Sequence, residues 1–215
     1  MPIRFVTSCG TGRGKTYISE KLISNWRAVG ETVDVLKPVI SGFEMETAEE
    51  SDTGLLLKAA GFDVTEETIN LTSPWRYQAP LSPDMAAALE GRAVHVDEMI
   101  SFCRARIVEA ERLNRSLLIE GAGGVMVPLD GHRTMRDLMT SLDIPVVLVV
   151  GSYLGSLSHT LTAIEALKSA DIRIDRLIVN EGTDSNIPLS DTRYALERFI
   201  DGIPMETVKF TAPSP

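Results

Sequence analysis

The feature that most constrains this chain is a glycine-rich segment near its N-terminus, Ser8-Cys9-Gly10-Thr11-Gly12-Arg13-Gly14-Lys15-Thr16. It follows an apolar run, Ile3 to Thr7, that is typical of a buried strand, and a helical pattern begins near Lys15. Strand, glycine loop, Gly-Lys-Thr and helix form the arrangement of a phosphate-binding loop, in which backbone N–H groups and a helix N-terminus surround an anion. We expect Lys15 to face nucleotide phosphates and Thr16 to offer its hydroxyl to Mg²⁺.

The match to this loop is incomplete. The usual pattern opens with a glycine at the position of Cys9, whereas this chain has its flexible residues at Gly10 and Gly12. A glycine-rich turn that binds nothing is the alternative interpretation of the segment. Cys9 and Cys103 do not have a metal-binding spacing.

Composition limits the classes of protein to consider. The chain has 215 residues, 44% of them hydrophobic, and its net charge of −9 (21 Lys and Arg against 30 Asp and Glu) disfavours a nucleic-acid surface. We expect a single domain over residues 1–215, with 211–215 as a frayed tail. No apolar run is long enough to span a bilayer and the N-terminus does not resemble a signal sequence, so we expect a cytoplasmic protein without membrane contact.

Strand and helix patterns alternate along the chain, which predicts an α/β fold with a mostly parallel sheet, helices on both faces and the topology of a phosphate-loop NTPase. The expected strands are residues 3–7, 33–39, 116–120, 145–150 and 176–180. The expected helices are residues 15–29, 53–60, 84–90, 96–113, 157–170 and 189–200, and residues 61–83 are expected to be irregular.

Ligands bind outside the carboxyl ends of the strands in such sheets, and polar or glycine residues stand at several of these ends. Lys37 ends one strand, Glu120 ends another before a run of glycines, and Asn180 ends a late strand. A buried lysine needs a negative partner, so Lys37 is a candidate second cation facing phosphate, with a solvent-reaching lysine as the alternative. Glu120 and Asp52 are candidate Mg²⁺ ligands, although Asp52 is equally suited to cap the helix that follows it.

The order of motifs resembles the dethiobiotin synthetase family over residues 3 to 205. The motifs that carry this resemblance are Gly14-Lys15-Thr16, Lys37-Pro38-Val39-Ile40-Ser41-Gly42, Ser51-Asp52, Ser82-Pro83, Glu120-Gly121-Ala122-Gly123-Gly124, Pro145 to Gly151, and Asn180. The second and fifth are more specific than the phosphate loop itself. The resemblance implies ATP- and Mg²⁺-dependent conversion of 7,8-diaminopelargonate and CO2 (or bicarbonate) to dethiobiotin, through a carbamate and a carbamic–phosphoric anhydride.

The resemblance also implies roles for individual residues. Lys15 and Lys37 stabilise charge on phosphates and carbamate, while Thr11 and Ser41 contact the reacting amine or carbamate. Thr16, Asp52 and Glu120 hold Mg²⁺. The residues implied to bind nucleotide are Gly12, Arg13, Gly14, Lys15, Thr16, Tyr17, Asp52, Glu120, Gly121, Ala122, Gly123 and Asn180, with Gly202, Ile203 and Pro204 lining the base pocket.

The family is a homodimer, so its substrate is expected at the interface between two copies. The residues implied for the substrate, beyond Thr11, Lys37 and Ser41, are Ser82, Pro83, Tyr153, Leu154, Gly155, Ser158 and Tyr194. This chain departs from the family pattern at four positions: Ser8 replaces a glycine, Gly12 an acidic residue, Tyr153 a lysine and Ser158 an asparagine.

Two other classes of function remain as alternatives. A regulatory or partitioning ATPase of the same fold typically carries an extra lysine early in the phosphate loop, which Ser8-Cys9-Gly10 lacks, and the net charge disfavours DNA binding. An ATP-dependent ligase with an altered substrate, or a non-catalytic relative, is favoured only by the substitutions at Gly12 and Tyr153.

Overall fold

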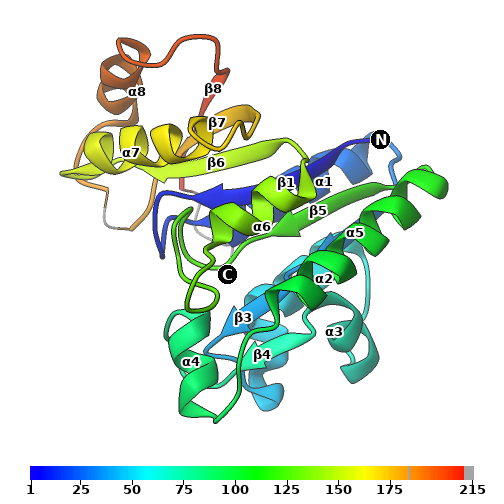
Figure 1. The fold of residues 1–215 in the computed structure, drawn as a ribbon. Helices are drawn as coiled ribbons and strands as arrows, with labels where there is room; N and C mark the ends of the chain where they lie inside the picture. The colour runs from blue at the N-terminus through cyan, green and yellow to red at the C-terminus, as the bar shows by residue number, and fades with distance from the viewer. Residues whose placement is uncertain (184, 211–215) are drawn as a thin grey trace.

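In a computed structural model of the chain, which describes residues 1–183 and 185–210, a six-stranded parallel sheet forms the centre of the molecule (Figure 1). Its strand order is β2-β5-β1-β6-β7-β8. The strands are β1 (Ile3–Ser8), β2 (Val33–Leu36), β5 (Ser116–Glu120), β6 (Val146–Gly151), β7 (Ile174–Asn180) and β8 (Met205–Val208). Because β1 lies between β5 and β6, the loop that leaves β1 emerges in the middle of the carboxyl edge.

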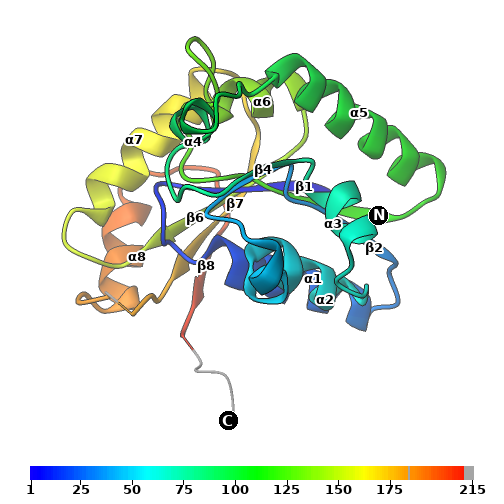
Figure 2. The same ribbon diagram turned by 90° about the horizontal axis from the view of Figure 1, so that it is seen from below.

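Helices cover both faces of the sheet, as Figure 2 shows. One face packs against α1 (Lys15–Ala28) and α2 (Asp52–Ala60), which bury Ile18, Ile23 and Leu56. The other face packs against α5 (Val96–Arg112), α6 (Met135–Leu142), α7 (Ser156–Lys168) and α8 (Leu189–Glu197). The expected fold class, a mostly parallel α/β sheet with helices on both faces, is therefore confirmed.

A smaller unit stands beside the carboxyl edge of β2. It contains a two-stranded parallel sheet, β3 (Val39–Ser41) with β4 (Trp75–Tyr77), together with a 3₁₀ helix η1 (Met45–Glu50), α3 (Glu66–Thr72) and α4 (Pro83–Leu89). Residues 33–39 are thus two strands rather than the single strand predicted, because the chain changes sheets at Lys37 and Pro38. Residues 61–83 also contain more regular structure than the sequence pattern indicated.

Three further findings bear on the predictions. Helix α6 and strand β8 were not anticipated from the sequence. The predicted frayed tail, residues 211–215, lies outside the described residues. Within residues 1–183 and 185–210, no helix combines the length and the apolar character that crossing a membrane requires.

Candidate active site

The phosphate loop connects the carboxyl end of β1 to the first residue of α1. Gly14 precedes that helix with φ at +81°, and a Cβ at this position would overlap the side-chain amide of Asn180, so the site requires glycine for both conformation and space. Lys15 is buried, and its Nζ donates to the hydroxyl of Ser8 at 3.3 Å. The helix N-terminus and an ammonium group therefore meet at one point of the loop, which suits an anion.

Lys37, Asp52 and Glu120 converge beside this loop. The Lys37 Nζ lies 2.8 Å from Asp52 Oδ2 and 2.7 Å from Glu120 Oε1, and it donates to the Gly121 carbonyl at 3.3 Å. The hydroxyl of Thr16 lies within hydrogen-bonding distance of the other Asp52 oxygen, at 2.8 Å, and of Glu120 Oε1, at 3.0 Å. Lys37 is therefore paired rather than solvated, and the alternative of a lysine that reaches solvent is wrong.

Local structure explains why both carboxylates are available. Ser51, not Asp52, caps helix α2, and its side chain accepts a hydrogen bond from the Gly54 N–H at 3.2 Å. Asp52 is the first helical residue and turns its carboxylate toward Thr16 and Lys37. Glu120 ends β5 with no exposed surface, and its second oxygen accepts from Ser19 at 2.6 Å.

The two lysines of the site differ in electrostatic environment. Burial, with the nearby charge of Lys37, lowers the pKa of Lys15 to about 8. Burial also acts on Lys37, but the carboxylates of Glu120 and Asp52 outweigh it and raise the pKa of Lys37. Burial acts against ionisation of Asp52 as well, yet the charge of Lys37 prevails and the pKa of Asp52 is lowered. Lys37 is thus held as a charged ammonium beside an ionised Asp52.

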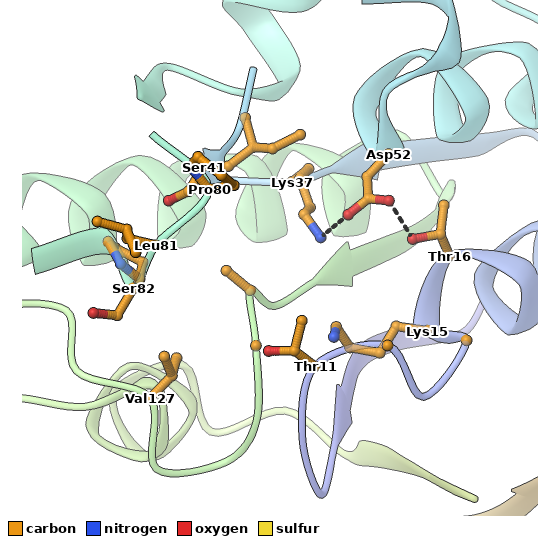
Figure 3. A pocket seen from close by; sticks show the side chains of 16 residues that line it. Thr11, Lys15, Thr16, Lys37, Ser41, Asp52, Pro80, Leu81, Ser82 and Val127 are labelled. Carbon is orange, nitrogen blue, oxygen red and sulfur yellow. Dashed lines mark hydrogen bonds and ion pairs between the residues drawn. The ribbon is translucent and has the colours of Figure 1, made fainter. Parts of the chain in front are cut away.

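A cavity of about 630 Å³ opens over these groups. In Figure 3, Thr11 and Lys15 extend from the phosphate loop, Lys37 and Asp52 lie across from them, and Ser41 and Ser82 lie at the far end. Among the described residues, the buried hydroxyl of Ser41 finds no hydrogen-bond partner, which suits a ligand at that end. The residues that line the cavity are Thr11, Gly12, Gly14, Lys15, Thr16, Lys37, Ile40, Ser41, Asp52, Pro80, Leu81, Ser82, Pro83, Ala122, Gly123 and Val127.

Most of the predicted site residues thus come together. Glu120 and Gly121 adjoin the cavity through Lys37, while Arg13 and Asn180 meet behind the loop, where the Asn180 amide donates to the Arg13 carbonyl at 3.2 Å. Ile40, Pro80, Leu81 and Val127 were not anticipated. They are ordinary apolar residues, and only the folded loops reveal that they line the cavity.

Gly202, Ile203 and Pro204 do not lie where the resemblance implied. Strand β8 runs parallel to β7 with Asn180 opposite Val208, and the carbonyl of Pro204 accepts from Leu177 near the other end of these strands. The three residues therefore precede β8 at the amino edge of the sheet, and their assignment to a base pocket beside Asn180 is wrong.

The segment just after β8 lies at the expected edge instead. Phe210 lies 6.2 Å from the ring of Tyr17, measured between ring centroids, and its N–H donates to Glu181 at 3.1 Å. The Tyr17 hydroxyl also contacts the Lys209 carbonyl, at 3.4 Å. Lys209 and Phe210 were missed because strand β8 was not predicted. Had it been, the rule that ligands bind at the carboxyl ends of the strands would have selected these two residues.

The residues after β6 lie outside the cavity. Leu154 and Tyr194 are 84% and 70% exposed, and Gly155 is the N-cap of helix α7, which carries Ser158. Tyr153 turns toward the phosphate loop of its own chain rather than outward, with the guanidinium carbon of Arg13 4.3 Å from its ring centroid. The expectation that the Tyr153 side chain meets a substrate tail does not fit this orientation.

Comparisons with known proteins agree with this geometry. A family model described as an AAA domain matches residues 4–206. A protein of Acidiphilium cryptum named ATP-dependent dethiobiotin synthetase BioD is 43% identical over 201 residues, which are 93% of this chain and 89% of that protein. A protein of the same name from Caulobacter sp. is 43% identical over 213 residues, 99% of this chain and 88% of its own length.

Solved structures share the fold at much lower identity. The signal recognition particle receptor FtsY of Elizabethkingia anophelis superposes with a TM-score of 0.54 at 14% identity, covering 95% of this chain and 57% of the receptor chain. A chain of the MinC:MinD cell division complex of Aquifex aeolicus gives a TM-score of 0.54 at 15% identity and covers 95% of this chain and 79% of its own. At these identities the likeness concerns the fold alone.

Proposed function

Because this chain belongs to the ATP-dependent dethiobiotin synthetase family, we propose that it is a ligase that forms dethiobiotin from 7,8-diaminopelargonate, CO2 and ATP. The observation that carries the proposal is one cavity that is shared by the phosphate loop, Lys37 and Asp52 at one end and by Ser41 and Ser82 at the other, with Glu120 held against Lys37 beneath it. One end suits a triphosphate and its metal, and the other suits a small polar substrate.

The reaction has three bond-forming steps. An amine nitrogen of the substrate attacks CO2 and loses a proton to give a carbamate. A carbamate oxygen then takes the γ-phosphoryl group and ADP departs. The second amine attacks the carbonyl carbon of this anhydride, phosphate leaves with the bonding electrons, the nitrogen loses a proton, and the cyclic urea closes.

Positioning and charge neutralisation are the main demands of these steps, and the residues present meet them. Lys15 at the helix N-terminus binds the terminal phosphates. Lys37, which has a raised pKa and remains an ammonium, neutralises the carbamate as it approaches the γ-phosphate. Thr11 and Ser41 offer hydroxyl groups to the amine and carbamate, and Ser82 lies at the same end of the cavity.

Thr16, Asp52 and Glu120 form a donor set that fits Mg²⁺. One oxygen of each carboxylate lies beside the Thr16 hydroxyl, at 2.8 Å for Asp52 and 3.0 Å for Glu120, and hard oxygen donors are the ligands that Mg²⁺ prefers. Mg²⁺ bound with ATP would neutralise charge on the phosphates. Asn180 supports an adenine site because its buried Oδ1 has no partner among the described residues and is available to accept from an exocyclic amine.

We further propose a homodimer in which the segment after β6 contributes to the partner's substrate site. The exposed side chains of Leu154 and Tyr194, with Gly155 and Ser158 beside them, support an interface at this place. Sedimentation equilibrium tests it, and a monomer at micromolar concentration would remove the shared site from the proposal.

The activity test is phosphate release from MgATP with bicarbonate, measured with and without 7,8-diaminopelargonate, while dethiobiotin is sought by mass spectrometry. Release that depends on the diamine, together with the cyclic urea, supports the proposal. Lys37→Gln should abolish turnover while keeping most of the affinity for ADP. ATP binding without diamine-dependent release would favour a ligase of altered substrate, for which the Gly12 and Tyr153 substitutions are the relevant observations.

A further inference from the structure

The phosphate loop is braced from outside the cavity by a cluster of four side chains: Cys9, Arg13, Tyr153 and His159. The Arg13 guanidinium carbon lies 4.3 Å from the Tyr153 ring centroid. The Tyr153 hydroxyl shares a hydrogen bond of 2.8 Å with His159 Nδ1 and lies 4.0 Å from the Cys9 sulfur. The cluster therefore joins the loop after β1 to the loop after β6 and to helix α7.

Arg13 needs such support because of its neighbours. It lies between Gly12 and Gly14, which both have a positive φ (+73° and +81°). Glycine has more backbone conformational freedom than any other residue type, so the chain on either side of Arg13 is easily disordered. Ordering each such residue costs about 1–2 kcal/mol of conformational entropy, which a ligand must otherwise supply when it binds.

The contacts of Arg13 fix this short glycine-flanked segment from three directions. Its Nε donates back to the Thr11 carbonyl at 3.2 Å, across Gly12. Its own carbonyl accepts from the Asn180 amide at 3.2 Å. Its guanidinium rests on Tyr153, whose position is set in turn by His159. The N–H groups that surround an anion are thus held in place before the anion arrives.

We infer that Tyr153 is a positioning residue for nucleotide binding: by stacking under Arg13 it pre-organises the phosphate loop of its own subunit. This inference rests on the proposed nucleotide site, and it gives Tyr153 a role in the subunit that carries it rather than in the partner. It also connects two positions at which the chain differs from its family's pattern, Gly12 and Tyr153, because the arginine that follows Gly12 is the one that stacks on Tyr153.

The test measures MgADP affinity by calorimetry for three variants of the full chain. Tyr153→Leu removes the ring and should raise the dissociation constant about 3- to 10-fold, the range expected for an arginine–aromatic contact at a partly exposed site. Tyr153→Phe keeps the ring and should stay within about twofold of the wild type. Phe199→Leu is the matched control, since it removes a ring from the remote Arg198–Phe199 pair and should not alter affinity.

A double-mutant cycle with Arg13→Ala separates the contact from general damage. If the two residues act through one contact, the double variant should bind MgADP no more weakly than the worse single variant. In the steady state, Tyr153→Leu should raise the KM for ATP with little change in kcat, whereas a merely unfolded fraction would lower kcat and leave the KM unchanged.

The possible outcomes test the positioning role of Tyr153, the arginine–aromatic contact and the nucleotide site separately. Unchanged MgADP affinity in Tyr153→Leu, or strictly additive effects in the cycle, would overturn the positioning role while leaving the nucleotide site intact. Failure of Tyr153→Phe to restore affinity would assign the effect to the hydroxyl and His159, and would refute the stack as its cause. Failure of the wild type to bind MgADP would refute the proposed function itself.

Discussion

Replacing Lys37 by methionine removes the ammonium group that contacts both Asp52 and Glu120. Glu120 has no exposed surface, so water does not replace its lost partner, whereas the Asp52 side chain is 43% exposed and is partly solvated already. Removing one partner of a buried pair costs about 3–5 kcal/mol. Because Glu120 keeps Ser19 and Thr16 as donors, we expect the low end of this range, about 3 kcal/mol.

The assay is thermal unfolding of the ligand-free proteins in EDTA. For a chain of this size, a loss of about 3 kcal/mol lowers the midpoint by roughly 6–12 °C. Adding Mg²⁺ should raise the midpoint of Lys37→Met more than that of the wild type, because the two carboxylates no longer share their charge with an internal cation. This second expectation depends on Mg²⁺ binding at Thr16, Asp52 and Glu120, and the first does not.

Lys58→Met is the matched control. Lys58 also makes a 2.8 Å ion pair, with Glu49, but both side chains are exposed and the pair should contribute nothing measurable. Equal midpoints of Lys37→Met and the wild type in EDTA would refute the reasoning about the buried pairs. Equal Mg²⁺ shifts in the two proteins would instead show that Lys37 and the metal do not compete for the same oxygens.

Three further predictions concern single residues. The pKa of Lys15, lowered to about 8, should rise when phosphates bind, so MgADP binding at pH 8 should be accompanied by uptake of about half a proton, measured by calorimetry in buffers of different ionisation enthalpy. Lys15→Arg should abolish that uptake, because arginine does not titrate at this pH. Equal proton uptake by both proteins would refute the assignment. Glu120→Ala should raise the Mg²⁺ concentration needed for half-maximal turnover, and an unchanged titration would remove Glu120 from the metal site. Gly14→Ala should lower the free energy of unfolding, measured by urea denaturation, by about 1–2 kcal/mol or more, because residue 14 has a positive φ and a Cβ there would overlap Asn180. Gly131→Ala is the control and should be nearly neutral, because a Cβ at that position meets open space. Equal effects of the two substitutions would contradict this account.

The sequence was most informative where chemistry and strand ends coincide. Lys37 and Glu120 each follow an apolar run, so parallel pairing of the two strands alone brings them to one edge of the sheet. In the structure the Lys37 Nζ lies 2.7 Å from Glu120 Oε1. The contact of Lys37 and Glu120 with Asp52 was harder to predict from the sequence, because a carboxylate at the start of a helix is just as well suited to cap that helix. Only the folded chain shows Ser51 in that capping position.

Other elements had signals that were overlooked. Thr134 and Asp137 form a capping box ahead of the buried Met135, Leu138 and Leu142, which is a sequence-level signature of helix α6. Pro38 lacks an N–H, which was a reason to end the second strand before it and to expect a new one after it. With β8 recognised, Phe210 rather than Pro204 would have been placed near Asn180.

The orientation of Tyr153 had no sequence signal, because it depends on a contact between residues 140 positions apart.

The two lysines of the site illustrate the same point in electrostatic terms. Lys15 and Lys37 are both buried, yet the pKa of one is lowered and that of the other is raised, since Lys15 donates to a neutral hydroxyl while Lys37 contacts two carboxylates. An incoming polyphosphate therefore relieves an uncompensated charge at Lys15, whereas it must draw Lys37 away from partners that already satisfy it. It follows that Lys15 should govern nucleotide affinity, and that Lys37 should act mainly where new negative charge develops, on the carbamate and the transferring phosphoryl group.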